Sequence, residues 1–89
     1  MWTWNDFMTG TLYLCIVKWP NGTEGLLFPR PGNVPLADTV EQGRKDFDRA
    51  VADLKSFVTK TQRDMTGTSI RLCLFRGGIA LEEYEFTQL

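Results

Sequence analysis

The sequence predicts an α+β fold with the element order ββαββ, in which one long helix packs on one face of a four-stranded antiparallel sheet. An amphipathic pattern with the period of a helix runs over residues 39–63. Residues 11–28 and 69–87 each hold two short apolar segments separated by turn residues, which is the pattern of a β-hairpin. The chain has 89 residues, the length of a single domain, so we expect these elements to share one core over residues 1–89.

The helix predicted over residues 39–63 has a marked start and end. Thr39 followed by Gln42 fits a capping box, and Asp38 followed by Glu41 offers a second frame for it. Lys60 and Arg63 suit the negative end of the helix dipole. A glycine inside the apolar stripe costs about 1 kcal/mol against alanine, so we expect another backbone to pass close to Gly43. The stripe is about 120° wide, as in a helix that covers a core, and consists of Val40, Gly43, Phe47, Ala50, Val51, Leu54, Phe57, Val58 and Thr61.

The first hairpin joins a strand over residues 11–19 to a strand over residues 23–28. Pro20 and Asn21 suit the centre of a type I turn, and Gly22 suits the left-handed position that follows it. This three-residue loop sets opposite charges and apolar side chains against each other: Lys18 with Glu24, Ile16 with Leu26 and Leu14 with Phe28.

The second hairpin pairs residues 69–76 with residues 80–87 around a Gly77–Gly78 turn. A two-residue turn would set Ile70 against Glu85 and Leu72 against Glu83. We prefer a three-residue loop because its cross-strand pairs match better in character: Ile70 with Phe86, Leu72 with Tyr84 and Arg71 with Glu85. For the whole sheet we favour the strand order 2-1-3-4, and the order 1-2-4-3 stays open.

Both faces of this sheet are apolar, although a two-layer domain needs only one apolar face. In these registers the face toward the helix holds Leu12, Leu14, Ile16, Leu26, Phe28, Ile70, Leu72, Leu74, Tyr84 and Phe86. The opposite face holds Tyr13, Cys15, Val17, Trp19, Leu27, Cys73, Phe75 and Leu81.

The N-terminal aromatic segment, residues 1–10, is expected to cover part of the second face. Asn5 or Asp6 is placed to cap one helical turn there. The segment is too short to cover the whole face, and a large apolar patch on a protein surface usually marks an interface. The predicted partner-binding residues are Trp2, Trp4, Phe7, Tyr13, Val17, Trp19, Leu27 and Phe75.

The two cysteines, Cys15 and Cys73, lie in apolar strand patterns. We expect both to be buried, free thiols on the same sheet face and on adjacent strands. No apolar run is long enough to cross a bilayer, and no secretory leader precedes the first strand. These features predict a cytoplasmic protein with no membrane partner.

The composition argues against several kinds of chemistry. The chain has no histidine, which excludes Ser-His and Cys-His nucleophiles and His-based zinc sites. Two cysteines alone make no zinc site, so we predict no metal, no cofactor and no catalytic residue. A net charge of -1 argues against nucleic acid as a partner. Mixed charges on the helix exterior, Asp46 among them, indicate a solvated face.

These observations favour a small, non-catalytic protein–protein interaction module that forms a homodimer or binds another protein. An inhibitor or adaptor of the kind that phages and other mobile elements encode is one such module, by analogy of size alone. The alternative hypothesis is a binder of a small ligand or nucleotide, built at a dimer interface. An enzyme that uses only carboxylates and arginine ranks below both.

Overall fold

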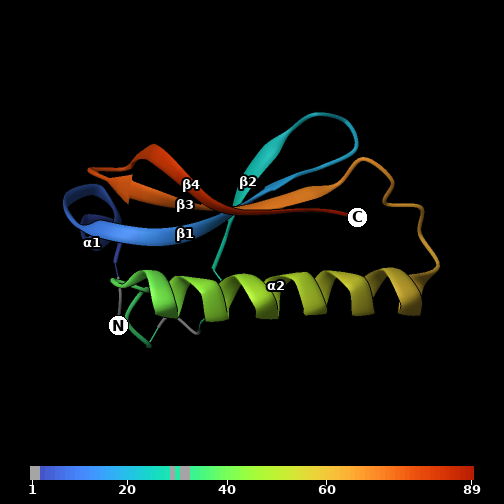
Figure 1. The fold of residues 1–89 in the computed structure, drawn as a ribbon, viewed down its shortest axis with the longest axis horizontal. Coiled ribbons are helices and arrows are strands. Elements are labelled where there is room, and N and C mark those ends of the chain that lie inside the picture. Colours follow the sequence, from blue (N-terminus) through green and yellow to red (C-terminus); the bar gives the residue numbers. More distant parts are fainter. Residues whose placement is uncertain (1–2, 29, 31–32) are drawn as a thin grey trace.

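The computed structural model of the chain describes residues 3–28, 30 and 33–89, and its main elements follow the predicted ββαββ order (Figure 1). The strands form one antiparallel sheet in the order β2-β1-β3-β4, which confirms the favoured order. The long helix α2 runs along one side of the sheet, and the short helix α1 lies beside the start of β1. The elements are α1 (Trp4–Thr9), β1 (Thr11–Lys18), β2 (Glu24–Leu27), α2 (Val40–Thr61), β3 (Ser69–Arg76) and β4 (Ile79–Gln88).

Helix α2 begins and ends for local reasons. The Thr39 hydroxyl accepts a hydrogen bond from the Gln42 N–H at 3.3 Å, so Thr39 is the N-cap and makes one of the two hydrogen bonds of the predicted capping box. Gln62 ends the helix in a left-handed conformation with φ 53°, and its N–H donates to the Val58 carbonyl. The helix therefore stops two residues before the predicted end because the chain reverses its local twist at Gln62.

Only the first half of α2 is buried in the protein. A Cβ atom on Gly43 would lie 2.7 Å from the Tyr13 Cβ and 3.2 Å from the Leu72 Cδ1, so the close neighbours of this glycine are side chains of β1 and β3 and not the predicted backbone. Leu54 in the second half of the helix is partly exposed, and Phe57 is 43% exposed. The apolar stripe thus continues past the region that the sheet covers. Its buried members are Gly43, Phe47 and Ala50, joined by Asp46.

The first hairpin has the predicted register and turn. Gly22 has φ 89°, and its N–H donates to the Trp19 carbonyl at 2.9 Å. The structure pairs Lys18 with Glu24 and Ile16 with Leu26. The turn residues are sufficient to set this register because the loop length determines which residues face each other.

The preferred register of the second hairpin is wrong. Gly77 and Gly78 both have positive φ, at 59° and 79°, which favours a two-residue loop. Arg76 accordingly pairs with Ile79 next to the turn. Two register shifts then move the pairing so that Leu72 faces Glu85 and Ile70 faces Thr87. These bulges place extra residues in β4, so neither simple register holds along the whole hairpin.

The predicted assignment of β1 to the two sheet faces is also wrong. Leu14 pairs with Cys73, and Cys15 pairs with Leu72, so odd residues of β1 share a face with even residues of β3. The side chains that face α2 therefore include Tyr13, Cys15, Val17 and Leu27 and not Leu12, Leu14, Ile16 and Leu26. Phe86 pairs with Arg71 on the face away from α2, where it is 55% exposed.

The face away from α2 is covered at one end by α1. The Phe7 ring lies 5.8 Å from the Phe75 ring, and both side chains are buried. Leu36, from the segment that leads to α2, joins the same cluster. Thr3 caps α1 and Asp6 completes the capping box, so the predicted cap at Asn5 or Asp6 is corrected to Thr3. The sheet thus lies between α2 on one side and α1 with Leu36 on the other.

Candidate protein-interaction surface

The residues predicted to bind a partner do not form one exposed face. Trp4 is 65% exposed, and Trp19 is half-buried beside the first turn. Tyr13 and Leu27 lie in the cluster that α2 covers. Trp2 lies outside the described residues. The others are core residues with at most 7% of their surface exposed: Phe7, Val17 and Phe75. The two sets of β1 side chains are both apolar, so the sequence could not show which set faces the helix.

The structure instead shows an apolar groove between β2 and the second half of α2. Its volume is about 300 Å³. Phe57 forms one wall of the groove and Leu27 lies on the other side, at the end of β2. The lining residues are Leu27, Phe28, Ala50, Asp53, Leu54 and Phe57.

Trp4 extends this groove around the end of β2. Its ring packs edge-on against Phe28, with 6.5 Å between ring centroids, and against Phe7 at 5.7 Å. An apolar path therefore runs from the second half of α2, past β2, to the exposed ring of Trp4. We call Trp4, Leu27, Phe28, Leu54 and Phe57 the β2-edge surface.

The backbone of β2 offers hydrogen-bonding groups at this edge. The Trp19 N–H donates to the Thr23 carbonyl at 2.8 Å, so the backbone groups of Thr23 point toward β1. The direction of backbone groups alternates along a strand. The N–H and C=O groups of Gly25 therefore also point toward β1, and those of Glu24 and Leu26 point away from it. β2 is the end strand of the sheet, and no described strand pairs with its outer side. An open strand edge can pair with an added strand.

The opposite edge, formed by β4, is protected against such pairing. The two register shifts in the β3–β4 pair disturb the regular spacing of its backbone groups. Glu82, Glu83 and Glu85 place acidic side chains along the strand, and Glu85 accepts a hydrogen bond from the Arg44 Nε at 3.1 Å. Bulges and charges are the usual means by which proteins protect an edge strand. β2 has no bulge, lysine or proline, and its one charged residue, Glu24, is paired with Arg71 of the same chain.

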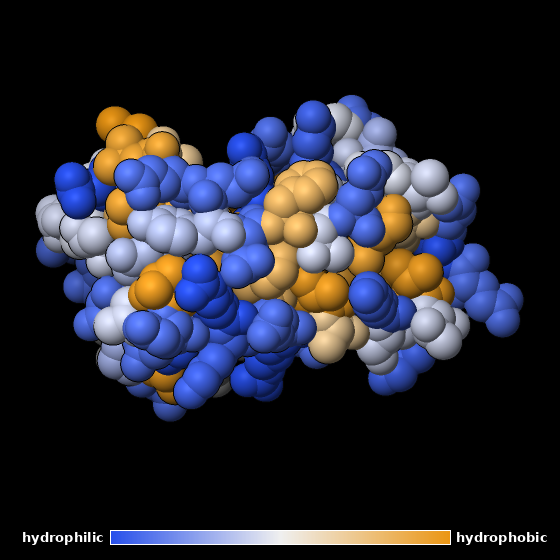
Figure 2. Space-filling model, in the orientation of Figure 1, coloured by the Kyte–Doolittle hydropathy of each residue, from blue (hydrophilic) through white to orange (hydrophobic). Residues whose placement is uncertain are grey.

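Other exposed apolar side chains gather around the β3–β4 turn. Met8, Ile79 and Leu81 are 56%, 65% and 52% exposed, and a Cβ on Gly78 would lie 3.0 Å from the Met8 sulfur. Figure 2 shows hydrophobic surface over this end of the sheet.

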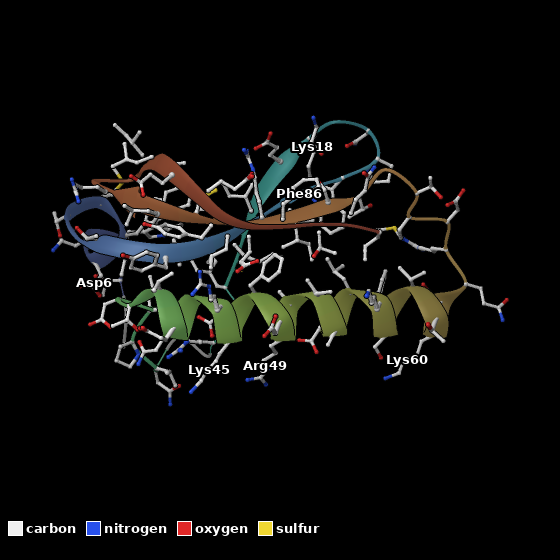
Figure 3. The ribbon with its side chains drawn as sticks, in the orientation of Figure 1. Asp6, Lys18, Lys45, Arg49, Lys60 and Phe86 are labelled. Carbon is white, nitrogen blue, oxygen red and sulfur yellow. The ribbon has the colours of Figure 1, made fainter. Side chains whose placement is uncertain are left out.

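Lys45 and Lys60 point from α2 away from the sheet (Figure 3). The charged outer side of α2, which carries both basic and acidic residues, thus faces away from the sheet.

An ion pair that the sequence did not predict joins Arg30 to Asp46 of α2. The Arg30 Nε donates to both carboxylate oxygens of Asp46 at 2.9 Å, and its Nη1 donates to the Pro35 carbonyl at 3.4 Å. Asp46 is buried and not solvated as predicted, because Arg30 covers it. Its position at the border of the apolar stripe was the only signal in the sequence. The pair holds the Arg30 side chain against α2.

The described residues contain no group of three or more His, Cys, Asp or Glu side chains arranged to hold a metal ion. They also contain no helix with the length and hydropathy needed to cross a membrane. Comparisons with protein-family models, with curated proteins and with solved structures gave no match.

Proposed function

We propose that this chain is a small protein–protein interaction module that binds its partner through the β2-edge surface. The observation that carries the proposal is the exposed ring of Phe57 beside the apolar groove and the open edge of β2. Large aromatic side chains are the residues that most often anchor a partner. An open strand edge adds backbone hydrogen bonds to such an anchor.

The second half of α2 supports this proposal because the described part of the chain leaves Phe57, a member of the apolar stripe, exposed. Phe57 lies in the same helical stripe as the buried Phe47, yet Phe57 is 43% exposed and Phe47 only 6%. Leu54 is partly exposed in the same groove. A bound protein would remove these side chains from water, at about 25 cal/mol for each Å² of apolar surface buried.

The proposal includes a partner that is either another protein or a second copy of this chain. An inhibitor or adaptor role of the kind that mobile elements encode remains part of the proposal, by analogy of size. The buried free thiols Cys15 and Cys73 support a reducing, cytoplasmic setting. The alternative hypothesis of a small-ligand binder stays a prediction. The groove beside Phe57 is the site at which such a ligand would bind.

Site-specific photo-crosslinking tests the proposed surface. A benzoylphenylalanine residue replaces Phe57 in one variant and Ala52 in the other, in cells that normally produce the protein. Ala52 is exposed on the same helix but about 140° around the axis from Phe57, so it is a matched control. We expect a covalent adduct of defined mass from position 57 and none from position 52. Equal adducts from both positions, or none from either, would contradict the proposal.

A further inference from the structure

We propose that a second copy of this chain binds the β2 edge, with the two β2 strands antiparallel about a two-fold axis through Gly25. This inference rests on the proposed function and identifies its partner. A two-fold axis is the commonest symmetry of soluble protein dimers, and it requires a surface that complements itself. The β2 strand meets this requirement through the outward backbone groups of Glu24 and Leu26, the single charge of Glu24 and the central position of Gly25.

The outward backbone groups of β2 determine the position of the axis. Within the strand, Glu24 and Leu26 point their N–H and C=O groups away from β1. An axis through Gly25 sets Glu24 opposite the partner's Leu26 and pairs every one of these groups. An axis through Leu26 would instead set Glu24 opposite the partner's Phe28, beyond the end of β2.

Charge excludes the remaining position. An axis through Glu24 would set two carboxylates directly opposite each other, which is unfavourable across a strand pair. With the axis through Gly25, each Glu24 lies opposite the partner's Leu26 and stays paired with Arg71 of its own copy. The Arg71 Nη2 donates to the Glu24 Oε2 at 2.8 Å from within the same copy.

The same axis brings the partner to the apolar groove. Leu27 lies opposite the partner's Thr23, because residues equally distant from Gly25 face each other across the axis. The partner's hairpin turn then lies at the Phe28 end of the strand, beside the groove and the Trp4 ring that packs on Phe28. The dimer would thus cover part of the β2-edge surface in both copies.

The exposed area predicts a weak dimer. Aromatic side chains bury about 150–250 Å² each, so Trp4 and Phe57, at 65% and 43% exposure, offer together roughly 160–270 Å² per copy. A standard interface buries about 800 Å² on each partner. We therefore expect a dissociation constant on the order of micromolar or weaker. Light scattering from roughly 1 μM to 1 mM should show the wild-type mass rising from 10.2 kDa toward twice that value.

Disulfide formation tests the axis directly. In an antiparallel pair, residues opposite each other at a non-hydrogen-bonded site have Cα atoms about 4.5 Å apart, within the range for a disulfide. A Cβ on Gly25 would meet only Val17 Cγ1 at 4.0 Å, so the Gly25→Cys variant has room to fold. We expect this variant to form a covalent dimer under mild oxidation. Lys45→Cys, on the exposed outer side of α2, is the control and should not do so at a comparable rate.

A proline at position 24 tests the strand pairing without oxidation. Glu24→Pro removes an N–H that points out of the sheet, at the first residue of β2, where proline is tolerated. Glu24→Ala removes the same carboxylate and keeps the N–H. Because two hydrogen bonds are lost per dimer, we expect Glu24→Pro to weaken association by about tenfold or more relative to Glu24→Ala. Equal association of both variants would overturn the inference.

The results separate this inference from the proposed function. A wild-type mass that stays at 10.2 kDa over the whole concentration range overturns the dimer. So does a Gly25→Cys variant that crosslinks no faster than Lys45→Cys. If the chain is monomeric but the probe at position 57 captures a different protein, the dimer is wrong and the proposed function stands. A monomer that also gives no adduct at position 57 contradicts both.

Discussion

Cys15 is a buried free thiol in the cluster that α2 covers, with 1% of its surface exposed. Burial raises the pKa of Cys15 from 9.0 to about 12, and the charges of Asp46 and Cys73 act in the same direction. A buried apolar environment disfavours the charged thiolate relative to the neutral thiol. The thiol therefore stays protonated in the folded chain at pH values where it ionises in the unfolded chain.

We predict that this difference makes the protein less stable in alkaline solution. Above about pH 9 the unfolded chain releases the Cys15 proton and the folded chain keeps it, so the free energy of unfolding falls as pH rises. The fall from this residue is at most about 1.4 kcal/mol per pH unit, up to the folded pKa of about 12. Urea unfolding between about pH 9 and about pH 10.5 should show a shallower fall for Cys15→Ala than for the wild type. Parallel curves would show that Cys15 does not contribute.

The apolar stripe of helix α2 is longer than the part of the sheet that it covers. Phe47 lies in the buried half with 6% exposure, and Phe57 lies in the exposed half with 43%. The buried half holds the helix on the sheet through Phe47, Ala50 and the close approach at Gly43. The exposed half is free to contribute to the β2-edge surface.

We predict that the two halves respond differently to the same substitution. Phe47→Ala should lower the free energy of unfolding by about 3–5 kcal/mol, since it opens a cavity in the core. Phe57→Ala should lower it by less than about 1 kcal/mol, since a largely exposed side chain loses little on truncation. Urea unfolding at low protein concentration, where the chain is monomeric, gives both values. Similar losses at the two positions would mean that Phe57 belongs to the core.

In the whole molecule, the sheet is buried on both faces at its α1 end. Phe7 covers Phe75 and lies in one cluster with Cys73, on the face away from α2. Cys15 lies on the opposite face, which corrects the prediction that the two thiols share a face. The two cysteines therefore report on the two faces of the sheet separately.

We predict that Phe7→Ala exposes one thiol and not the other. Loss of the Phe7 ring opens the cluster around Cys73. Iodoacetamide should therefore modify Cys73 at least about tenfold faster in the native state. A tenfold increase means that the free energy of local opening around Cys73 falls by about 1.4 kcal/mol. Cys15 stays covered by α2 and should keep its slow rate. Met8→Ala, at a 56% exposed position of the same helix, is the control. Equal acceleration of both cysteines would show that the substitution unfolds the whole chain.

Much of the fold could be predicted because its signals are local. The period of α2, its Thr39 cap and the positive φ of Gly22 all follow from residues within a few positions of each other. The candidate surface could be predicted only in part. The aromatic segment at residues 1–10 predicts a role for Trp4 in partner binding, whereas the helical stripe shared with Phe47 predicts a core position for Phe57, which is 43% exposed.

The sequence by itself determined the element order, the extent of the helix, the first hairpin and the presence of two apolar sheet faces. The tertiary structure alone decided which set of β1 side chains faces α2, because Leu14 and Cys15 are equally suited to burial. It also decided the bulges of β4 and the burial of Asp46 under Arg30. The physical reason is the same in each case. Local patterns set the conformation of a segment, whereas its register and exposure depend on contacts with residues far away in the chain.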